Sequence, residues 1–281
     1  LVLDNNRSAA VEGKMPEAGP PSTAPVEAEV DRDLFATAKL GMLDQLKQIV
    51  EAAAATGADD DGTTNPVFDV NAVDDGGATP LIYAAKNGHA ECVAFLLARG
   101  ANVDDAGHGG LTPLHHAANH VQEAVVSTLL DADANPNATD DAGLTPLHYA
   151  STMGALNILV KLIEKQADVN AASTTSRTTP LHAAALAGGD AMVTRLVEYG
   201  AELDAQDARG YAALHYAAEI GVPKVVDVLL AHRASTTLEA RDGKTPAACA
   251  TRDDIKRKFV ASPPPGDAAA ADAGGSGSGS G

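Results

Sequence analysis

A Thr-Pro pair that recurs about every 33 residues is the strongest constraint on how this chain can fold. The pair stands at Thr79-Pro80, Thr112-Pro113, Thr145-Pro146, Thr179-Pro180 and Thr245-Pro246. A degenerate copy, Ala212-Ala213, fills the one gap, so the steps between proline positions are 33, 33, 34, 33 and 33 residues. Such a regular period predicts a stack of repeated units in place of one globular core.

The copy around Thr145 indicates the structure of one unit. Thr145 is a good helix N-cap because its hydroxyl can accept from a free backbone N–H, and Pro146 suits the first helical position. The helix is expected to end at Gly154, since glycine takes the positive φ that closes a helix. A second helix is expected from Ala155 to Lys165, where apolar residues follow helical spacing. The helix-ending glycine recurs at Gly41, Gly88, Gly188 and Gly221.

One unit departs from this pattern at its helix end. Val121 stands where the other units have glycine. A β-branched residue disfavours positive φ, so we expect the turn at Val121 to differ from the equivalent turns.

The unit resembles the ankyrin repeat. A Thr-Pro-Leu-His opening, a second helix ending in two aliphatic residues and a Gly-Ala-x-Val-Asp/Asn ending carry the resemblance, which covers Asp33 to Val260. It implies an all-α, L-shaped ankyrin-repeat solenoid of helix-turn-helix units joined by β-hairpin loops. It also implies a concave face that binds other proteins.

Composition along the chain divides it into three parts. Residues 1–32, rich in Ala, Pro and Glu, are expected to be a disordered lead, and residues 261–281 a flexible Pro/Ala and then Gly/Ser tail. Residues 33–260 are the expected repeat domain, with an N-cap at 33–70, five repeats at 71–237 and a shortened C-cap at 238–260. Within the N-cap, Ala52 to Ala55 is expected to extend a helix, and Asp59 to Gly62 to form an acidic loop.

The formal net charge of −18 argues against nucleic acid and anionic membranes as partners. We expect another protein with a basic or neutral surface. Cys92 and Cys249 lie several repeats apart and are not expected to pair, which favours a reducing compartment, the cytoplasm or alternatively the nucleus. The chain does not begin with Met, which is compatible with a fragment of a longer protein.

No motif indicates an enzyme, a cofactor or a metal site. His115, His148, His182 and His215 recur once per unit, and we expect them to hydrogen-bond within and between repeats, because packed helices about 8–10 Å apart cannot bring them to one ion. His116 and His120 share a helix face, but the Glu of the metalloprotease pattern is replaced by Ala117.

The resemblance places partner contacts at hairpin tips and at exposed positions of each first helix. The tip candidates are Asp75, Ala78, His108, Leu111, Asp141, Leu144, Thr178, Arg209, Tyr211 and Lys244. The first-helix candidates are Lys86, Asn87, Asn119, His120, Thr152, Met153, Leu186, Glu219 and Ile220. Leu111, Leu144 and Tyr211 either form an exposed apolar stripe or lean on the next hairpin. The expected function is a non-catalytic adaptor or scaffold; the alternative is a regulatory, inhibitory or assembly subunit of one enzyme or large complex.

Overall fold

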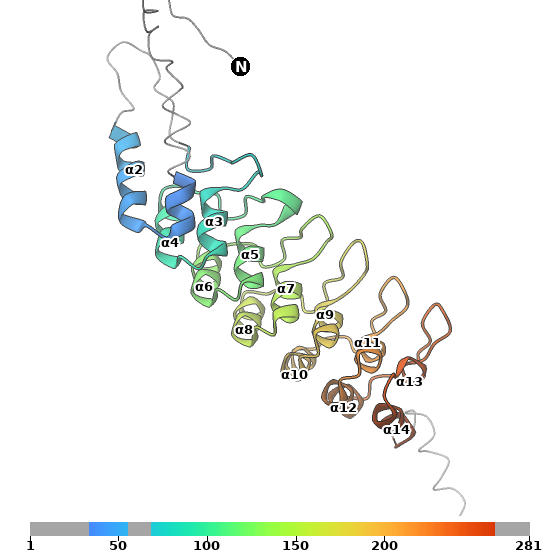
Figure 1. Ribbon diagram of the computed structural model, residues 1–281. Coiled ribbons are helices and arrows are strands. Elements are labelled where there is room, and N and C mark those ends of the chain that lie inside the picture. Colours follow the sequence, from blue (N-terminus) through green and yellow to red (C-terminus); the bar gives the residue numbers. More distant parts are fainter. Residues whose placement is uncertain (1–33, 56–68, 262–281) are drawn as a thin grey trace, which may run out of the picture.

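The computed structural model describes residues 34–55 and 69–261 of the chain. Figure 1 shows helix pairs stacked side by side in two layers, with a loop projecting from each repeat on the side of the first helices. Every regular element in the described ranges is helical. The expected all-α solenoid is therefore confirmed, whereas the three-part division of the chain remains a prediction, because its two outer parts lie outside the described residues.

Each repeat contributes a first helix that begins at the proline position and a second helix that runs back beside it. The pairs are α3 (Pro80–Lys86) with α4 (Ala90–Ala98), α5 (Pro113–Asn119) with α6 (Glu123–Asp131), α7 (Pro146–Met153) with α8 (Leu156–Glu164), α9 (Pro180–Ala187) with α10 (Asp190–Glu198), and α11 (Ala213–Ile220) with α12 (Pro223–Ala231). A short 3-10 turn, η1 (His108–Gly110), lies in one loop.

An incomplete repeat lies at each end of the stack. At the N-terminal end, a helix over residues 34–40 precedes α2 (Leu43–Ala55), which confirms that the alanine run extends that helix. The expected loop from Asp59 to Gly62 lies outside the described residues. At the C-terminal end, α13 (Pro246–Cys249) has only four residues and is followed by α14 (Asp253–Ala261).

The recurring histidine fastens each first helix at its start and to the next repeat. In α7 the N–H of Thr145 donates to Nδ1 of His148 (3.1 Å), so the ring proton is on Nε2, which donates to the carbonyl of Thr178 in the next repeat (2.9 Å). The same pair of bonds recurs at His115, His182 and His215. The expected hydrogen bonding within and between repeats is confirmed.

The core runs as one cluster along the stack between the two helix layers. Leu147 of α7 and Leu159 of α8 are fully buried, and small alanines such as Ala150 and Ala184 let neighbouring helices approach. Because each helix pair buries its apolar face largely against adjacent pairs, stability is shared between neighbours. Cys92 and Cys249 are both buried and unpaired, as expected.

Hydrogen bonds between side chains and the backbone also join the repeats outside the core. Asn137 is typical: its side-chain oxygen accepts from the N–H of Asp168 (2.7 Å), and its amide donates to the carbonyl of Gln166 (3.0 Å). Asn71 and Asn170 make the same two kinds of bond to the repeat that follows each of them.

The turn at Val121 contradicts our expectation. Val121 takes φ 56°, the same left-handed region as the glycines at equivalent positions. At Gly88 a Cβ atom would lie 2.3 Å from the side-chain oxygen of Gln122, which would have to move aside. One repeat later the position of Gln122 is held by Ala155, whose small side chain leaves room for valine. The repeat geometry therefore imposes the left-handed conformation despite a backbone cost of order 1 kcal/mol.

Candidate protein-binding surface

An aspartate and a tyrosine fasten the hairpin to the first helix in alternate repeats. In the repeat of α7, Oδ1 of Asp140 accepts from the N–H groups of Ala142 (2.9 Å) and Leu144 (2.8 Å), and Oδ2 accepts from the hydroxyl of Tyr149 (2.7 Å). Asp74 with Tyr83 and Asp207 with Tyr216 repeat this arrangement at 2.6 Å. The hairpin is thereby fixed relative to the first helix.

The tyrosines in these pairs are neutral donors. Burial, and then the hydrogen bond to Asp207, raise the pKa of Tyr216 to about 12. The pKa of Tyr149 is raised by the same causes in the same order. The Tyr83 hydroxyl lowers the pKa of Asp74 by stabilising its carboxylate. At neutral pH the pairs are therefore hydroxyl-to-carboxylate hydrogen bonds, a strong class.

The repeat of α9 lacks this pair. Ser173 stands in place of the aspartate and Ala183 in place of the tyrosine. Its hairpin is one residue longer, closes from the N–H of Ser173 to the carbonyl of Thr178, and carries Arg177 at φ 55°. The Ser173 hydroxyl accepts from the N–H of Thr178 (3.2 Å), which replaces one of the missing carboxylate bonds.

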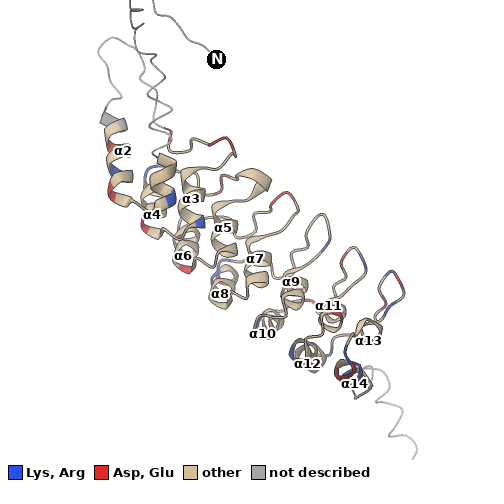
Figure 2. Ribbon diagram, viewed as in Figure 1, with Lys and Arg blue, Asp and Glu red and all other residues tan. Residues whose placement is uncertain are grey.

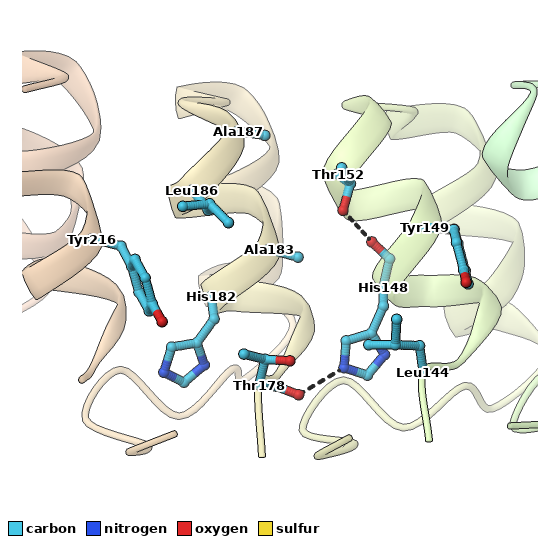
Figure 3. Close-up of a pocket in the computed structure, with 10 residues that line it drawn as sticks. All are labelled: Leu144, His148, Tyr149, Thr152, Thr178, His182, Ala183, Leu186, Ala187 and Tyr216. Atoms are coloured by element: carbon cyan, nitrogen blue, oxygen red, sulfur yellow. Dashed lines mark hydrogen bonds between the residues drawn. The ribbon is translucent and has the colours of Figure 1, made fainter. Parts of the chain in front are cut away.

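A pocket of about 250 Å³ opens on the first-helix side where Ala183 replaces tyrosine. Figure 3 shows Ala183 between the rings of Tyr149 and Tyr216, which come from the repeats on either side. The lining residues are Leu144, His148, Tyr149, Thr152, Thr178, His182, Ala183, Leu186, Ala187 and Tyr216. Because Ala183 lacks the ring that its counterparts carry, the space stays open.

The polar side chains that line this pocket already form hydrogen bonds within the protein. The hydroxyls of Tyr149 and Tyr216 donate to aspartates, and Nε2 of His182 donates to the carbonyl of Tyr211 (2.9 Å). The Thr152 hydroxyl donates to the carbonyl of His148 (3.0 Å), as Figure 3 also shows. The pocket therefore offers apolar contact more than free hydrogen-bonding groups.

Three exposed apolar side chains come from the ends of the first helices of three successive repeats, and one of them, Leu186, lines the pocket. Met153 of α7 is 49% exposed, Leu186 of α9 is 56% exposed and Ile220 of α11 is 44% exposed. We call these three residues the apolar row. Exposed apolar side chains that gather on one face are typical of an interaction site.

The remaining residues that the sequence predicts as partner contacts differ in their exposure. Those with exposed side chains are Asp75, Lys86, Asn87, His108, His120, Asp141, Thr152, Arg209, Glu219 and Lys244. Those that are half-buried are Ala78, Leu111, Asn119, Leu144 and Thr178. The pocket brings together Leu144, Thr152, Thr178 and Leu186, whereas the tips of the early repeats do not reach it.

The expectation that Tyr211 is an exposed contact is wrong. Its side chain is 2% exposed, and its ring lies 5.1 Å from that of His215 and 5.4 Å from that of Tyr216, centroid to centroid. Tyr211 therefore belongs to the core, because it packs beneath the hairpin. The exposed stripe of Leu111, Leu144 and Tyr211 does not exist.

His116 and His120 do share a face, with ring centroids 6.4 Å apart. Nδ1 of His120 donates to the carbonyl of His116 (2.9 Å), and burial lowers the pKa of His116 to about 4. Among the described residues no group of three or more His, Cys, Asp or Glu side chains is placed to hold a metal ion.

Sequence reasoning missed the residues that create the pocket and its surroundings, namely Ala183, Arg177 and Arg241. The sequence does contain a clue to the pocket, because three repeats have tyrosine at the position that Ala183 holds, namely at 83, 149 and 216. The sequence alone does not show that this position lies on the exposed first-helix face.

Comparisons with known proteins agree with this architecture. The family model for ankyrin repeats (three copies) matches residues 34–140, 107–173, 126–207 and 181–260. The crystal structure of the human ASB11 ankyrin repeat domain is similar at TM-score 0.69 and 24% identity, over 83% of this chain and 98% of that one. The ankyrin repeat domain of Bcl-3, described as a unique member of the IkappaB protein family, is similar at TM-score 0.68 and 26% identity, over 80% and 97%. No curated protein matches the sequence. In the described residues, no helix has the length and hydropathy to cross a membrane.

Proposed function

The chain belongs to the ankyrin-repeat family, and we propose that it acts as a non-catalytic adaptor or scaffold that binds another protein through the first-helix face of its central repeats. Ankyrin repeats are protein–protein interaction modules, and the family match indicates no enzyme family. The proposal therefore concerns which surface binds, and to what effect.

The observation that carries the proposal is the apolar row, which meets the pocket at Leu186. Met153, Leu186 and Ile220 are each at least 44% exposed, and Leu186 also lines the pocket. Exposed apolar side chains around a recess can be covered by a partner, and such central contacts usually contribute most of the binding energy.

The hairpins next to this row are held in place by hydrogen bonds within the chain. The Asp140–Tyr149 and Asp207–Tyr216 bonds fix the hairpins on both sides, and the histidine bonds tie each repeat to the next. A surface already in its bound shape loses little conformational entropy on association, which favours binding.

Affinity capture tests the proposal. The immobilised full chain is exposed to an extract of the source organism beside a Met153→Ser/Leu186→Ser/Ile220→Ser variant, and bound proteins are identified by mass spectrometry. We expect the parent to retain a protein that the variant loses, because the variant removes the apolar contacts.

A matched control keeps this result specific. The Val73→Ser/Tyr199→Ser/Val260→Ser variant removes three exposed apolar side chains that lie away from the row. It should retain the same protein as the parent. Equal capture by both variants and the parent contradicts the proposal, and so does capture of nothing by the parent. An effect of the chain on the captured protein's activity separates inhibition from tethering.

A further inference from the structure

Three arginines stand on three consecutive hairpin tips, the first of which contributes Thr178 to the pocket. Arg177, Arg209 and Arg241 are all exposed. Backbone bonds join their hairpins in order: the N–H of Ala208 donates to the carbonyl of Ser176 (2.8 Å), and the N–H of Arg241 donates to the carbonyl of Arg209 (3.0 Å). Figure 2 shows acidic residues on the loops of the earliest repeats, basic ones on the loops near α9 and α11, and both kinds on the loop near α13. We call Arg177, Arg209 and Arg241 the arginine row.

The guanidinium groups of this row are available. Within the described part of the chain, none of the three makes an ion pair with a carboxylate. Arg209 instead lies over the ring of Tyr211, with its Cζ atom 4.1 Å from the ring centroid. Arg209 also interacts with the hydroxyl of Tyr216, and the remaining N–H groups of its guanidinium can donate to an anion.

The arginine row and the pocket are contiguous. Arg177 immediately precedes Thr178, which lines the pocket. On the other side, Arg209 contacts Tyr211, and Tyr211 packs 5.4 Å from Tyr216, whose ring forms the opposite wall. A single extended segment can therefore place one side chain in the pocket and the next ones against the arginines.

We propose that the occupant is a segment of a partner protein in which one aliphatic side chain fills the pocket and neighbouring aspartates or glutamates bind Arg177, Arg209 and Arg241. This inference rests on the proposed function and specifies the chemistry of the partner. The pocket requires the aliphatic group because its own hydroxyl and imidazole groups are already hydrogen-bonded. The arginine row requires the anion because guanidinium and carboxylate groups form paired, charge-assisted bonds.

The proposal reverses the expectation that net charge alone suggests. The whole chain carries −18, which favours a basic or neutral partner. Exposed charges farther apart than about 8 Å are largely screened at physiological ionic strength. Of the hairpins at the pocket, that of Leu144 carries the exposed Asp141, whereas those of Thr178 and Tyr211 carry Arg177 and Arg209. The anionic part of the segment therefore belongs on the α9 and α11 side of the pocket.

A peptide selection tests the proposal. A random peptide library displayed on phage is selected on the immobilised full chain, in parallel with an Arg177→Glu/Arg209→Glu/Arg241→Glu variant and with an Ala183→Tyr variant. Ala183→Tyr restores the ring that three other repeats carry and so fills the pocket. We expect the parent to enrich peptides that combine Leu, Ile or Met with nearby Asp or Glu. The triple variant should instead enrich Lys and Arg, and Ala183→Tyr should lose the aliphatic preference.

Affinity measurements on the enriched peptide complete the test. By fluorescence anisotropy, the triple variant should bind it about tenfold or more weakly, which corresponds to about 1.4 kcal/mol. A Lys224→Glu/Arg233→Glu/Arg257→Glu variant changes net charge equally at exposed positions outside the row and should bind it as the parent does. Thermal melting shows that each variant is folded.

Several results overturn the proposal. These are enrichment of basic peptides by the parent, no enrichment at all, equal loss from both charge-reversal variants, or tighter binding of a single-stranded uridine oligonucleotide than of the acidic peptide. A protein still captured from extract through the apolar row under any of these results leaves the proposed function standing and removes only the partner chemistry.

Discussion

Leu147→Asp is expected to unfold the central repeat and its two neighbours together. Leu147 is fully buried in α7, which packs between α5 and α9. The substitution removes about 2–3 kcal/mol of apolar burial and leaves a carboxylate without a partner in the core. The loss should reach about 5 kcal/mol, a large share of the 5–15 kcal/mol typical of a domain. Urea unfolding followed by circular dichroism measures it.

Hydrogen exchange shows how far that loss spreads. If neighbours share one core, amides of α5 and α9 should lose protection along with those of α7. Leu186→Asp is the matched control, since Leu186 lies in the adjacent repeat and is 56% exposed. It should change the free energy of unfolding by about 1 kcal/mol or less. Equal losses from the two variants, or protection lost in α7 alone, contradict the shared core.

The protein should begin to lose stability at a pH well above the range in which carboxylates titrate. Burial lowers the pKa of His115, His116, His148, His182 and His215, in the case of His116 from 6.5 to about 4. Because the folded state holds these rings neutral, their contribution is complete above the unfolded pKa and is lost as pH falls through the folded one. For His116 alone the loss by pH 4 is about 3 kcal/mol.

The melting temperature measured from pH 7 down to pH 4.5 tests this expectation. It should fall throughout this window, because protonating Nδ1 of a histidine such as His148 also removes the acceptor for its helix N-cap N–H. The His116→Gln variant, which cannot titrate at that position, should lose less stability than the parent over the same range. A melting temperature that stays constant from pH 7 to pH 4.5 contradicts the role of the buried histidines.

The fold could be predicted because each constraint on it is local and repeated. Thr145 and Pro146 set a helix start, Gly154 sets its end, and the same residues return in most repeats, so one correctly interpreted unit gives the whole stack. Val121 shows the limit of local reasoning. The packing of the repeats imposes a left-handed turn on a residue that disfavours it, and the small Ala155 stands at the facing position of the next repeat.

The binding surface could be predicted only in part. Residues at the ends of first helices, such as Met153 and Leu186, are exposed because the last two positions of the helices α7, α9 and α11 face outward. Tyr211 could not be placed correctly, because the direction of a hairpin side chain depends on the rings packed beneath it. The pocket was equally hidden, since it arises from the absence of a ring at Ala183 between two neighbours that keep theirs.

Photo-crosslinking tests most directly whether the first-helix face binds the partner. Benzoylphenylalanine placed at Leu186, on α9, is compared with the same group at Tyr199, which is 39% exposed at the end of α10. Irradiation in the presence of the captured protein should give a covalent complex from position 186 and none from position 199. A complex from position 199 alone would contradict the account, because it would place the partner on the opposite helix layer.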